Sequence, residues 1–264
     1  MTTVALTIAG SDPSGGAGIQ ADLKTFSALG AYGMSVITAL TAQSTQGVAA
    51  VQAIAPEFVA AQFNTLYQDI KIDSVKMGML MDKEIVTTVY QLLKNKPIPI
   101  IVLDTVMIAK GGHPLLKSDA VSAIRDLLLP LATVITPNLP EAAALLDCDE
   151  AQTEEEMQQQ GYELLSLGCK AVLMKGGHLT SQESPDYLIT RDNTIRMTST
   201  RVQTKNTHGT GCTLSAAITA LLPRHNLEMA IHQAKDYLQG AISHADNLAI
   251  GKGIGPTHHF YRWW

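Results

Sequence analysis

The chain has 264 residues, of which 46% are hydrophobic and 16% are charged, enough to bury the core of one large α/β domain. This hydrophobic fraction excludes intrinsic disorder, and no apolar run approaches the ~18 residues that a membrane helix needs. The 19 basic and 24 acidic residues give a net charge of −5, which argues against a nucleic-acid partner. No secretory signal is visible at the start, and the three cysteines are expected to be reduced thiols of a cytoplasmic protein.

Short apolar runs alternate with amphipathic stretches along most of the chain. The expected strands are residues 4–9, 35–41, 74–79, 98–104, 133–136 and 171–175. The expected helices are residues 18–29, 56–68, 82–93, 118–128 and 153–167. Thr153 and Glu156 have the spacing of a capping box, and Gly168 fits a C-terminal cap. Strands that are apolar throughout and alternate with helices predict a mostly parallel sheet with helices on both faces.

The C-terminal part has a different pattern. Three shorter, more polar strands are expected at residues 187–190, 194–197 and 202–204, and they predict a small antiparallel edge. An apolar helix over residues 211–222 and a long helix over residues 226–248 follow, the second with an apolar stripe typical of core packing. No repeat or linker is visible, so a single domain spanning residues 1–264 is predicted.

A glycine-rich loop at residues 10–18, GSDPSGGAG, joins the first strand to the first helix. Ligands of open α/β sheets bind beyond the carboxyl ends of strands, where this loop lies. Its spacing is neither the dinucleotide fingerprint nor the G-x-x-x-x-G-K-[ST] phosphate loop, so a tight turn and a ligand site are equally open. Asp12 and Asp22 add carboxylates nearby.

A second loop at residues 206–212, NTHGTGC, is a sharper signal. Gly209, Thr210 and Gly211 precede a helix that begins near Cys212, and successive N–H groups there predict an anion site. The same field is expected to lower the thiol pKa of Cys212. A turn with a buried cysteine is the alternative, but the clustering favours the site.

Three other strand ends carry polar residues. Asn138 and Glu141 have the N-cap and N3 spacing, so a helix start explains them better than a metal or phosphate site. Lys175 beside two glycines could bind phosphate or be solvated, and Asp104 could hold Mg²⁺ through water. The histidines and cysteines lack zinc-site spacings.

Seven ordered segments form a recognisable set: residues 5–24 (ALTIAGSDPSGGAGIQADLK), 38–43 (TALTAQ), 76–79 (KMGM), 102–107 (VLDTVM), 136–142 (TPNLPEA), 174–178 (MKGGH) and 205–213 (KNTHGTGCT). Together they closely resemble the bacterial hydroxymethylpyrimidine/phosphomethylpyrimidine kinases of thiamine biosynthesis, which belong to the ribokinase superfamily. Residues 255–259 (GPTHH) match as well, so the resemblance covers the whole chain.

The resemblance implies a ribokinase-like fold, a homodimer and ATP-dependent phosphorylation with Mg²⁺. The implied substrate is 4-amino-5-hydroxymethyl-2-methylpyrimidine, followed by its monophosphate. The pyrimidine pocket would comprise Gln43, Asp22, Met79 and Val106. Gln43 would bind the ring edge, because an amide donates and accepts at once, as an aminopyrimidine requires.

The resemblance further implies an anion hole and a nucleotide side. The anion hole would comprise Gly209, Gly211 and Cys212, the nucleotide side Lys175, Asn138, Glu141 and Thr210, and the metal ligands Asp104 and Glu141. Most of the superfamily has an aspartate base where this chain has Cys212, a weaker base. The second phosphorylation scarcely needs a base, because its nucleophile is already a phosphate oxygen.

Three alternatives stay open. A pyridoxal kinase has the same fold and ATP site, and Cys212 could trap its aldehyde substrate. An NAD-dependent Rossmann oxidoreductase is disfavoured by the missing G-x-G-x-x-G. A nucleotide-binding regulator without catalysis would bind ATP but form no product.

Overall fold

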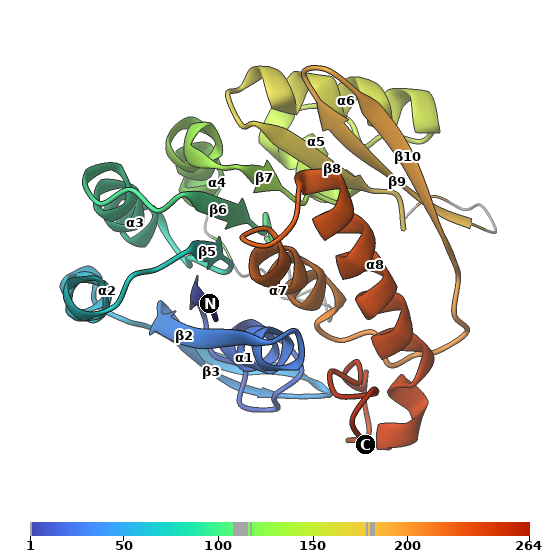
Figure 1. Ribbon diagram of the computed structural model, residues 1–264, viewed down its shortest axis with the longest axis horizontal. Coiled ribbons are helices and arrows are strands. Elements are labelled where there is room, and N and C mark those ends of the chain that lie inside the picture. The colour runs from blue at the N-terminus through green and yellow to red at the C-terminus, as the bar shows by residue number, and fades with distance from the viewer. Residues whose placement is uncertain (1, 108–115, 117, 178, 180–182) are drawn as a thin grey trace.

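The computed structural model describes residues 2–107, 116, 118–177, 179 and 183–264 (Figure 1). Its strands are β1 (Thr3–Ala9), β2 (Ala31–Ile37), β3 (Ala39–Ser44), β4 (Gly47–Ala53), β5 (Ser74–Met77), β6 (Ile100–Leu103), β7 (Val134–Ile135), β8 (Ala171–Lys175), β9 (Glu183–Thr190) and β10 (Thr194–Thr200). Its α-helices are α1 (Gly18–Ala28), α2 (Pro56–Asp69), α3 (Lys83–Asn95), α4 (Ser118–Ala123), α5 (Leu139–Leu146), α6 (Glu154–Ser166), α7 (Thr210–Leu221) and α8 (Leu227–Ser243). Three short helices complete the fold: the π-helix η1 (Ile124–Leu128) and the 3-10 helices η2 (Leu129–Leu131) and η3 (Ala245–Leu248).

An eight-stranded sheet forms the centre of the molecule, in the order β10-β9-β8-β7-β6-β5-β1-β2 (Figure 1). The strands from β8 to β2 are parallel, whereas β9 and β10 form an antiparallel edge. β3 and β4 form a separate antiparallel pair. This confirms the predicted mostly parallel sheet with a small antiparallel edge.

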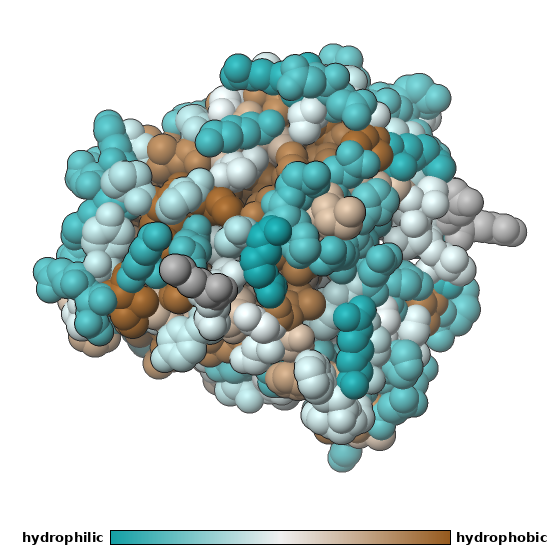
Figure 2. Space-filling model, viewed as in Figure 1, coloured by the Kyte–Doolittle hydropathy of each residue, from teal (hydrophilic) through white to brown (hydrophobic). Residues whose placement is uncertain are grey.

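Helices cover both faces of the sheet. Successive strand side chains point to opposite sides, and because the parallel strands are mostly apolar, apolar side chains on both faces must be buried. In β6, Ile101 and Leu103 belong to the core that also contains residues of α2 to α6, and Val102 belongs to the core with α7 and α8. α1 lies on the α7 side, where Phe26 and Ala216 share a cluster. On the face shown in Figure 2, hydrophilic residues cover much of the surface and hydrophobic ones lie between them.

The helix-end signals are confirmed. The Thr153 hydroxyl accepts a hydrogen bond from Glu156 N at 3.1 Å, and the Glu156 carboxylate accepts one from Thr153 N at 3.2 Å. Gly168 follows α6 with a φ of +114°, a conformation that glycine adopts at little cost. A second capping box, between Asn138 and Glu141, begins α5.

Two strand predictions were wrong. Residues 35–41 are not one strand, because β2 ends at Ile37 and the chain leaves the large sheet to begin β3 at Ala39. Residues 202–204 form no strand, because β10 ends at Thr200 and the chain crosses toward α7. β4 was not predicted, because most of its side chains are exposed or half-buried and show no apolar face.

Two helix predictions were wrong at their ends. The helix expected over residues 118–128 changes from α to π geometry at Ile124, and the long C-terminal helix ends at Ser243. Ala245 is still buried, so the apolar stripe continues past the end of α8 and hides the break. Among the described residues, no helix combines the length and apolar composition that crossing a membrane requires.

The order of the strands determines where a ligand can bind. β1 pairs with β2 on one side and with β5 on the other, so the direction of chain progression reverses at β1. Open α/β sheets bind ligands at such a switch point, beyond the carboxyl ends of the strands. The loops that follow β1, β6, β7 and β8 meet there.

Candidate active site

A cavity of about 990 Å³ lies at the carboxyl ends of β1, β5, β6, β7 and β8, between the beginning of α7 and the side of α8. Eleven of the residues expected at the site line it: Gln43, Met79, Asp104, Val106, Asn138, Glu141, Lys175, Gly209, Thr210, Gly211 and Cys212. Asp22 does not line the cavity, and the other residues come from six different segments of the chain. The tertiary structure therefore brings the separate sequence motifs to one place.

The beginning of α7 divides the cavity. Gly209 is its N-cap residue, with a φ of +81°, and a Cβ there would lie 1.7 Å from Gly16 O. The helix makes its first hydrogen bond from Thr213 N to Gly209 O at 2.8 Å, so the N–H groups of Gly211 and Cys212 have no acceptor within the helix. A Cβ on Gly211 would lie 3.8 Å from Lys175 Nζ and 4.0 Å from both carboxylate oxygens of Asp104, with nothing closer. These features favour an anion between α7 and Lys175.

The pKa of the Cys212 thiol differs from the expectation. Burial and the carboxylates of Asp104 and Asp22 raise the pKa of Cys212 to about 12, although Lys76 and the Gly18 backbone act in the opposite direction. The predicted lowering by the helix N-terminus was therefore wrong. The physical reason is tertiary: the fold places two carboxylates near a thiol that is partly removed from water.

A buried group of charges lies behind Cys212. Lys76 Nζ is 2.7 and 2.9 Å from the two oxygens of Asp22, and the Thr7 hydroxyl donates to Asp22 at 2.6 Å. Lys76 Nζ also lies 3.8 Å from Asp104 Oδ2, to which Ser215 donates at 2.9 Å. Burial lowers the pKa of Lys76, but the surrounding negative groups outweigh it and raise the pKa above its usual value. Lys76 is therefore a cation, and Asp22 lies outside the cavity as its partner.

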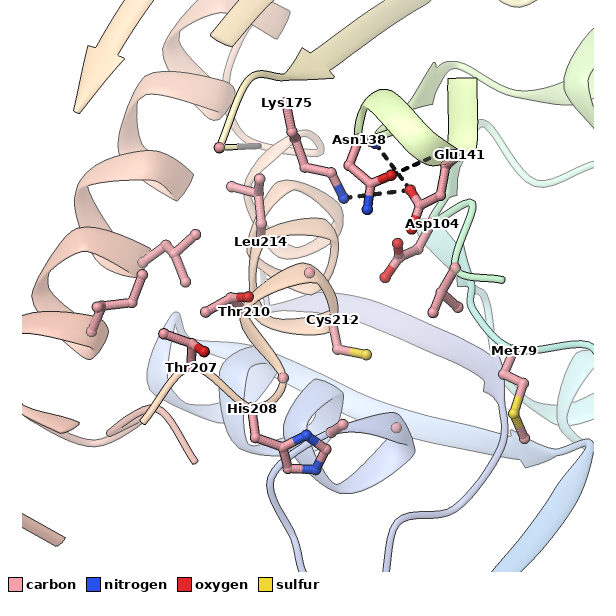
Figure 3. A pocket seen from close by; sticks show the side chains of 18 of the residues that line it. Met79, Asp104, Asn138, Glu141, Lys175, Thr207, His208, Thr210, Cys212 and Leu214 are labelled. Carbon is pink, nitrogen blue, oxygen red and sulfur yellow. Dashed lines mark hydrogen bonds and ion pairs between the residues drawn. The ribbon is translucent and has the colours of Figure 1, made fainter. Parts of the chain in front are cut away.

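The polar side of the cavity is formed by the start of α5 and the end of β8 (Figure 3). Glu141 Oε2 accepts hydrogen bonds from Asn138 N at 3.0 Å and from the Thr105 hydroxyl at 2.9 Å. Lys175 Nζ lies 3.8 Å from the same oxygen. Burial lowers the pKa of Lys175, but Glu141, Asp104 and Asp186 outweigh it and raise the pKa, so this side chain is charged. His178, from the same matching segment, lies outside the described residues.

Two carboxylates of this side fit a magnesium ion. Asp104 and Glu141 are both buried and line the cavity, and the contacts of each to protein groups are concentrated on one oxygen. The described residues contain no cluster of three or more His, Cys, Asp or Glu side chains able to hold a metal. Mg²⁺ commonly uses one or two carboxylates together with waters and substrate phosphates, so two carboxylates suffice for a site of that kind.

The opposite end of the cavity carries apolar side chains. Met79 and Val106 line it, and a Cβ on Gly10 would lie 2.3 Å from Met79 Cε. Gln43 follows an irregularity in the β3–β4 pairing between Ala42 and Gln43, and its side chain enters the cavity. A bulge of this kind redirects a side chain out of the alternation of its strand.

Several cavity residues were missed from the sequence. Lys76 lies inside an otherwise apolar strand, and a lysine in that position was an available signal. His208 contacts Asp12 across two loops, which no local pattern indicates. Leu238 and Ile242 of α8 line the cavity, although the stripe they belong to was expected to be core.

A parallel α/β sheet with a glycine-rich helix start between an apolar pocket and a pocket of Lys175 and two carboxylates defines a ribokinase-like small-molecule kinase. The solved structures agree with this class. The chain is similar to a pyridoxal kinase of Bacillus subtilis in complex with ADP, with a TM-score of 0.92, 37% identity and 99% of each chain covered. It is also similar to the phosphomethylpyrimidine kinase of Clostridium difficile 630, with a TM-score of 0.82 and 43% identity over 91% of this chain and 100% of that one.

Sequence comparison identifies the family within this class. The model of the phosphomethylpyrimidine kinase family matches residues 12–258. The hydroxymethylpyrimidine/phosphomethylpyrimidine kinase of Escherichia coli K12 is 60% identical over 261 residues, which cover 98% of each chain. The chain therefore belongs to the phosphomethylpyrimidine kinase family, and it is a phosphotransferase. This confirms the resemblance and the kinase prediction over the oxidoreductase and the regulator without catalysis.

Proposed function

We propose that the protein transfers a phosphoryl group from ATP to the hydroxymethyl group of 4-amino-5-hydroxymethyl-2-methylpyrimidine, and then a second one to the monophosphate. One observation carries the proposal: a single cavity has an apolar end with Gln43, a polar end with Lys175, and the start of α7 between them. A donor at the polar end and an acceptor at the apolar end would meet at the helix N-terminus. Holding two reactants in line supplies much of the catalysis of phosphoryl transfer.

The pyrimidine binds between Met79 and Val106 in this proposal, with its amino edge toward Gln43. The Gln43 amide can donate to a ring nitrogen and accept from the exocyclic amine. Asp22 takes part through Lys76, because it does not line the cavity but pairs with the ammonium group of Lys76, a fully buried side chain at the cavity wall. Gln43 is the side chain at this end that would both donate to and accept from the ring edge, so selectivity depends mainly on its amide.

ATP binds at the other end, where Lys175 neutralises phosphate charge and Asn138, Glu141 and Thr210 lie around it. The N–H groups of Gly211 and Cys212 point at the transferred phosphoryl group, with Gly209 holding the turn open. Asp104 and Glu141 would hold Mg²⁺, which when bound neutralises phosphate charge. Backbone donors of this kind stabilise charge that develops in a transition state.

Cys212 acts as the base of the first step in this proposal, by way of its minor thiolate form. Its raised pKa makes that form scarce at neutral pH. The second step proceeds without a base, since a phosphomonoester with a second pKa near ~6 is already ionised at pH 7. The two steps therefore differ in their need for Cys212.

The direct test is an ATP-consumption assay over a panel of pyrimidine and pyridine alcohols, with the products identified by mass. We expect the pyrimidine to be converted to its monophosphate and then its diphosphate, and neither product to form when ATP is omitted. Pyridoxal belongs in the panel, because the B. subtilis pyridoxal kinase shares the fold at a TM-score of 0.92. Faster turnover of pyridoxal than of the pyrimidine would replace the proposal with the pyridoxal kinase alternative.

We further propose that the protein acts as a homodimer in the cytoplasm. β2 is one of the two edge strands of the large sheet and carries Tyr32, 60% exposed, while Leu40 of β3 and Phe58 of α2 are exposed as well. Exposed apolar side chains at a sheet edge suit a protein interface. The described cysteines are free thiols, consistent with a reducing compartment. A monomeric mass by light scattering at working concentration would contradict the dimer.

A further inference from the structure

We propose that Asp12 and His208 form a positioning pair that keeps the Gln43 amide free to bind the substrate pyrimidine, an inference that rests on the proposed role of Gln43. The two residues are far apart in the sequence and belong to the two glycine-rich loops. Both line the cavity and both are buried. The pair lies beside the catalytic groups and is separate from them.

Asp12 organises the first loop. One oxygen of its carboxylate accepts from the backbone and the hydroxyl of Ser14 at 2.9 and 2.7 Å. The other oxygen accepts from Ala17 N at 2.8 Å and lies 2.7 Å from His208 Nε2. Burial raises the pKa of Asp12, but the hydrogen bonds from His208, Ser14 and Ala17 outweigh it and hold the pKa below its usual value. The carboxylate is therefore ionised and only accepts hydrogen bonds.

The two loops are in direct backbone contact, so the ring of His208 is held in place. A Cβ on Gly16 would lie 2.4 Å from His208 Cδ2, and a Cβ on Gly209 would lie 1.7 Å from Gly16 O. On its other side, His208 N donates to Gly255 O at 3.0 Å. Little room is left for the ring to turn away from Asp12.

His208 Nε2 faces two side chains, Asp12 at 2.7 Å and Gln43 Nε2 at 3.4 Å. Because the carboxylate only accepts, it selects the ring form with a proton on Nε2. That proton prevents the ring from accepting a hydrogen bond from Gln43. The Thr41 hydroxyl lies 2.8 Å from Ser11 O and 3.2 Å from Gln43 Oε1, so its single proton is directed to the nearer Ser11 carbonyl. With the His208 ring unable to accept, the Gln43 N–H groups stay available for a ring nitrogen of the substrate.

Loss of the carboxylate would reverse this arrangement. Without Asp12, the neutral ring can carry its proton on Nδ1, and Nε2 then accepts from the Gln43 amide. The amide would be held by the protein and would have to be released before it could bind the pyrimidine. The expected result is weaker pyrimidine binding, with ATP binding unaffected.

The experiment compares Asp12→Ala with Asp12→Asn and with Ser14→Ala, measuring KM for the pyrimidine and for ATP and kcat. We expect Asp12→Ala to raise the pyrimidine KM roughly tenfold, the size of one buried hydrogen bond, with the ATP KM within about twofold. Asp12→Asn should restore most of the affinity, because its amide oxygen still accepts from His208. Ser14→Ala is the matched control, because it removes a hydrogen bond from the other oxygen of Asp12.

A second measurement distinguishes a positioning role of Asp12 and His208 from a merely structural role of the loop. In a Gln43→Leu background, Asp12→Ala should change the pyrimidine KM by less than about twofold, since the two act on the same interaction. The proposal would be overturned if Asp12→Ala raised the pyrimidine KM by the same factor with and without Gln43. It would also be overturned if Asp12→Ala raised the ATP KM as much as the pyrimidine KM. If Asp12→Ala does not fold, His208→Leu tests the mechanism from the other side: with no ring to accept from the Gln43 amide, the pyrimidine KM should stay within about twofold of the wild type, and a roughly tenfold rise would overturn the proposal.

The ring form of His208 can be observed directly by ¹⁵N NMR of the histidine side chains. We expect the Nε2–H form in the wild type and a shift toward Nδ1–H in Asp12→Ala. An Nδ1–H wild-type ring would overturn the proposal by itself. Failure of the proposed function is a different result, since the wild type would then not phosphorylate the pyrimidine at all.

Discussion

The ammonium group of Lys76 lies 2.7 Å from the Asp22 carboxylate, and neither side chain has any exposed surface. The pair is placed behind the cavity, where Lys76 also approaches Asp104. A buried ion pair adds little net stability relative to apolar residues, but removal of one partner leaves an unpaired buried charge. The effect on stability of replacing Lys76 is therefore expected to depend on whether Asp22 is present, and the reverse.

Lys76→Met should lower the free energy of unfolding by about 3–5 kcal/mol, because Asp22 would be left buried and uncompensated. The double variant Lys76→Met with Asp22→Asn should recover most of the loss. Urea denaturation measures both. Arg125→Met, which breaks an exposed contact to Asp126, is the control and should change stability little. A single Lys76 variant as stable as the wild type would show that the pair does not act in this way.

Gln43→Leu should weaken pyrimidine binding by about 1–3 kcal/mol, because a buried hydrogen-bonding group of the substrate loses its partner. The affinity for ATP should stay the same, since Lys175 and the start of α7 are unchanged. Isothermal titration with each ligand measures the two separately. Gln52→Leu makes the same chemical change on the exposed side of the neighbouring strand and should have no effect. Unchanged pyrimidine affinity in Gln43→Leu would remove Gln43 from the pocket.

Gly209 and Gly211 should respond differently to alanine. A Cβ at Gly209 meets Gly16 O at 1.7 Å and the φ is +81°, so Gly209→Ala should lower stability and solubility. A Cβ at Gly211 meets nothing closer than 3.8 Å, so Gly211→Ala should fold normally. Its methyl group would face Lys175 and the phosphate position, so turnover should fall. Thermal unfolding and steady-state kinetics together test this, and wild-type turnover in Gly211→Ala would leave that segment as a turn only.

The two phosphorylations should depend differently on pH and on Cys212. With the thiol pKa raised to about 12, the thiolate fraction grows about tenfold per pH unit from pH 6 to pH 9. If the thiolate is the base, kcat/KM of the first step should rise with that slope, and the second step should be nearly flat above pH 7. Cys212→Ala should remove the slope and slow the first step by roughly 10²–10⁴-fold. Equal losses in both steps, measured from each purified substrate, would leave Cys212 as part of the anion hole only.

Stability should fall in mild acid because of His259. Burial lowers the pKa of His259 to about 3, so between about pH 6.5 and pH 3 the unfolded chain binds a proton that the folded protein does not. The free energy of unfolding should therefore decrease as pH falls through this range, by at most about 1.4 kcal/mol per unit for this group. His259→Gln can keep the contact with the Thr213 hydroxyl and should show a weaker pH dependence. His232→Gln, at an exposed position of α8, should keep the wild-type dependence.

Local signals in the sequence were sufficient for much of the fold. The capping boxes at Thr153 and Asn138 depend on contacts three residues apart, and both are present. Apolar strands alternating with helices indicated the parallel sheet, and the two short polar strands at residues 187–190 and 194–197 indicated its antiparallel edge. The glycines around Gly209 predicted a helix start, and α7 begins there. This was predictable because a positive φ is a local conformation that glycine adopts at little cost.

Only the tertiary structure determines which of these motifs are in contact and what electrostatic environment each residue has. Asp22 looked like a pocket residue, but it is buried behind Lys76, and that depends on which strands are neighbours. The thiol of Cys212 was expected to have a lowered pKa from its helix, yet the carboxylates brought by β6 and α1 and the loss of water raise it. The sequence by itself determined which residue types and local turns are present. Electrostatic environment, burial and contacts such as Asp12 with His208 involve residues up to 196 positions apart, so only the folded chain could determine them.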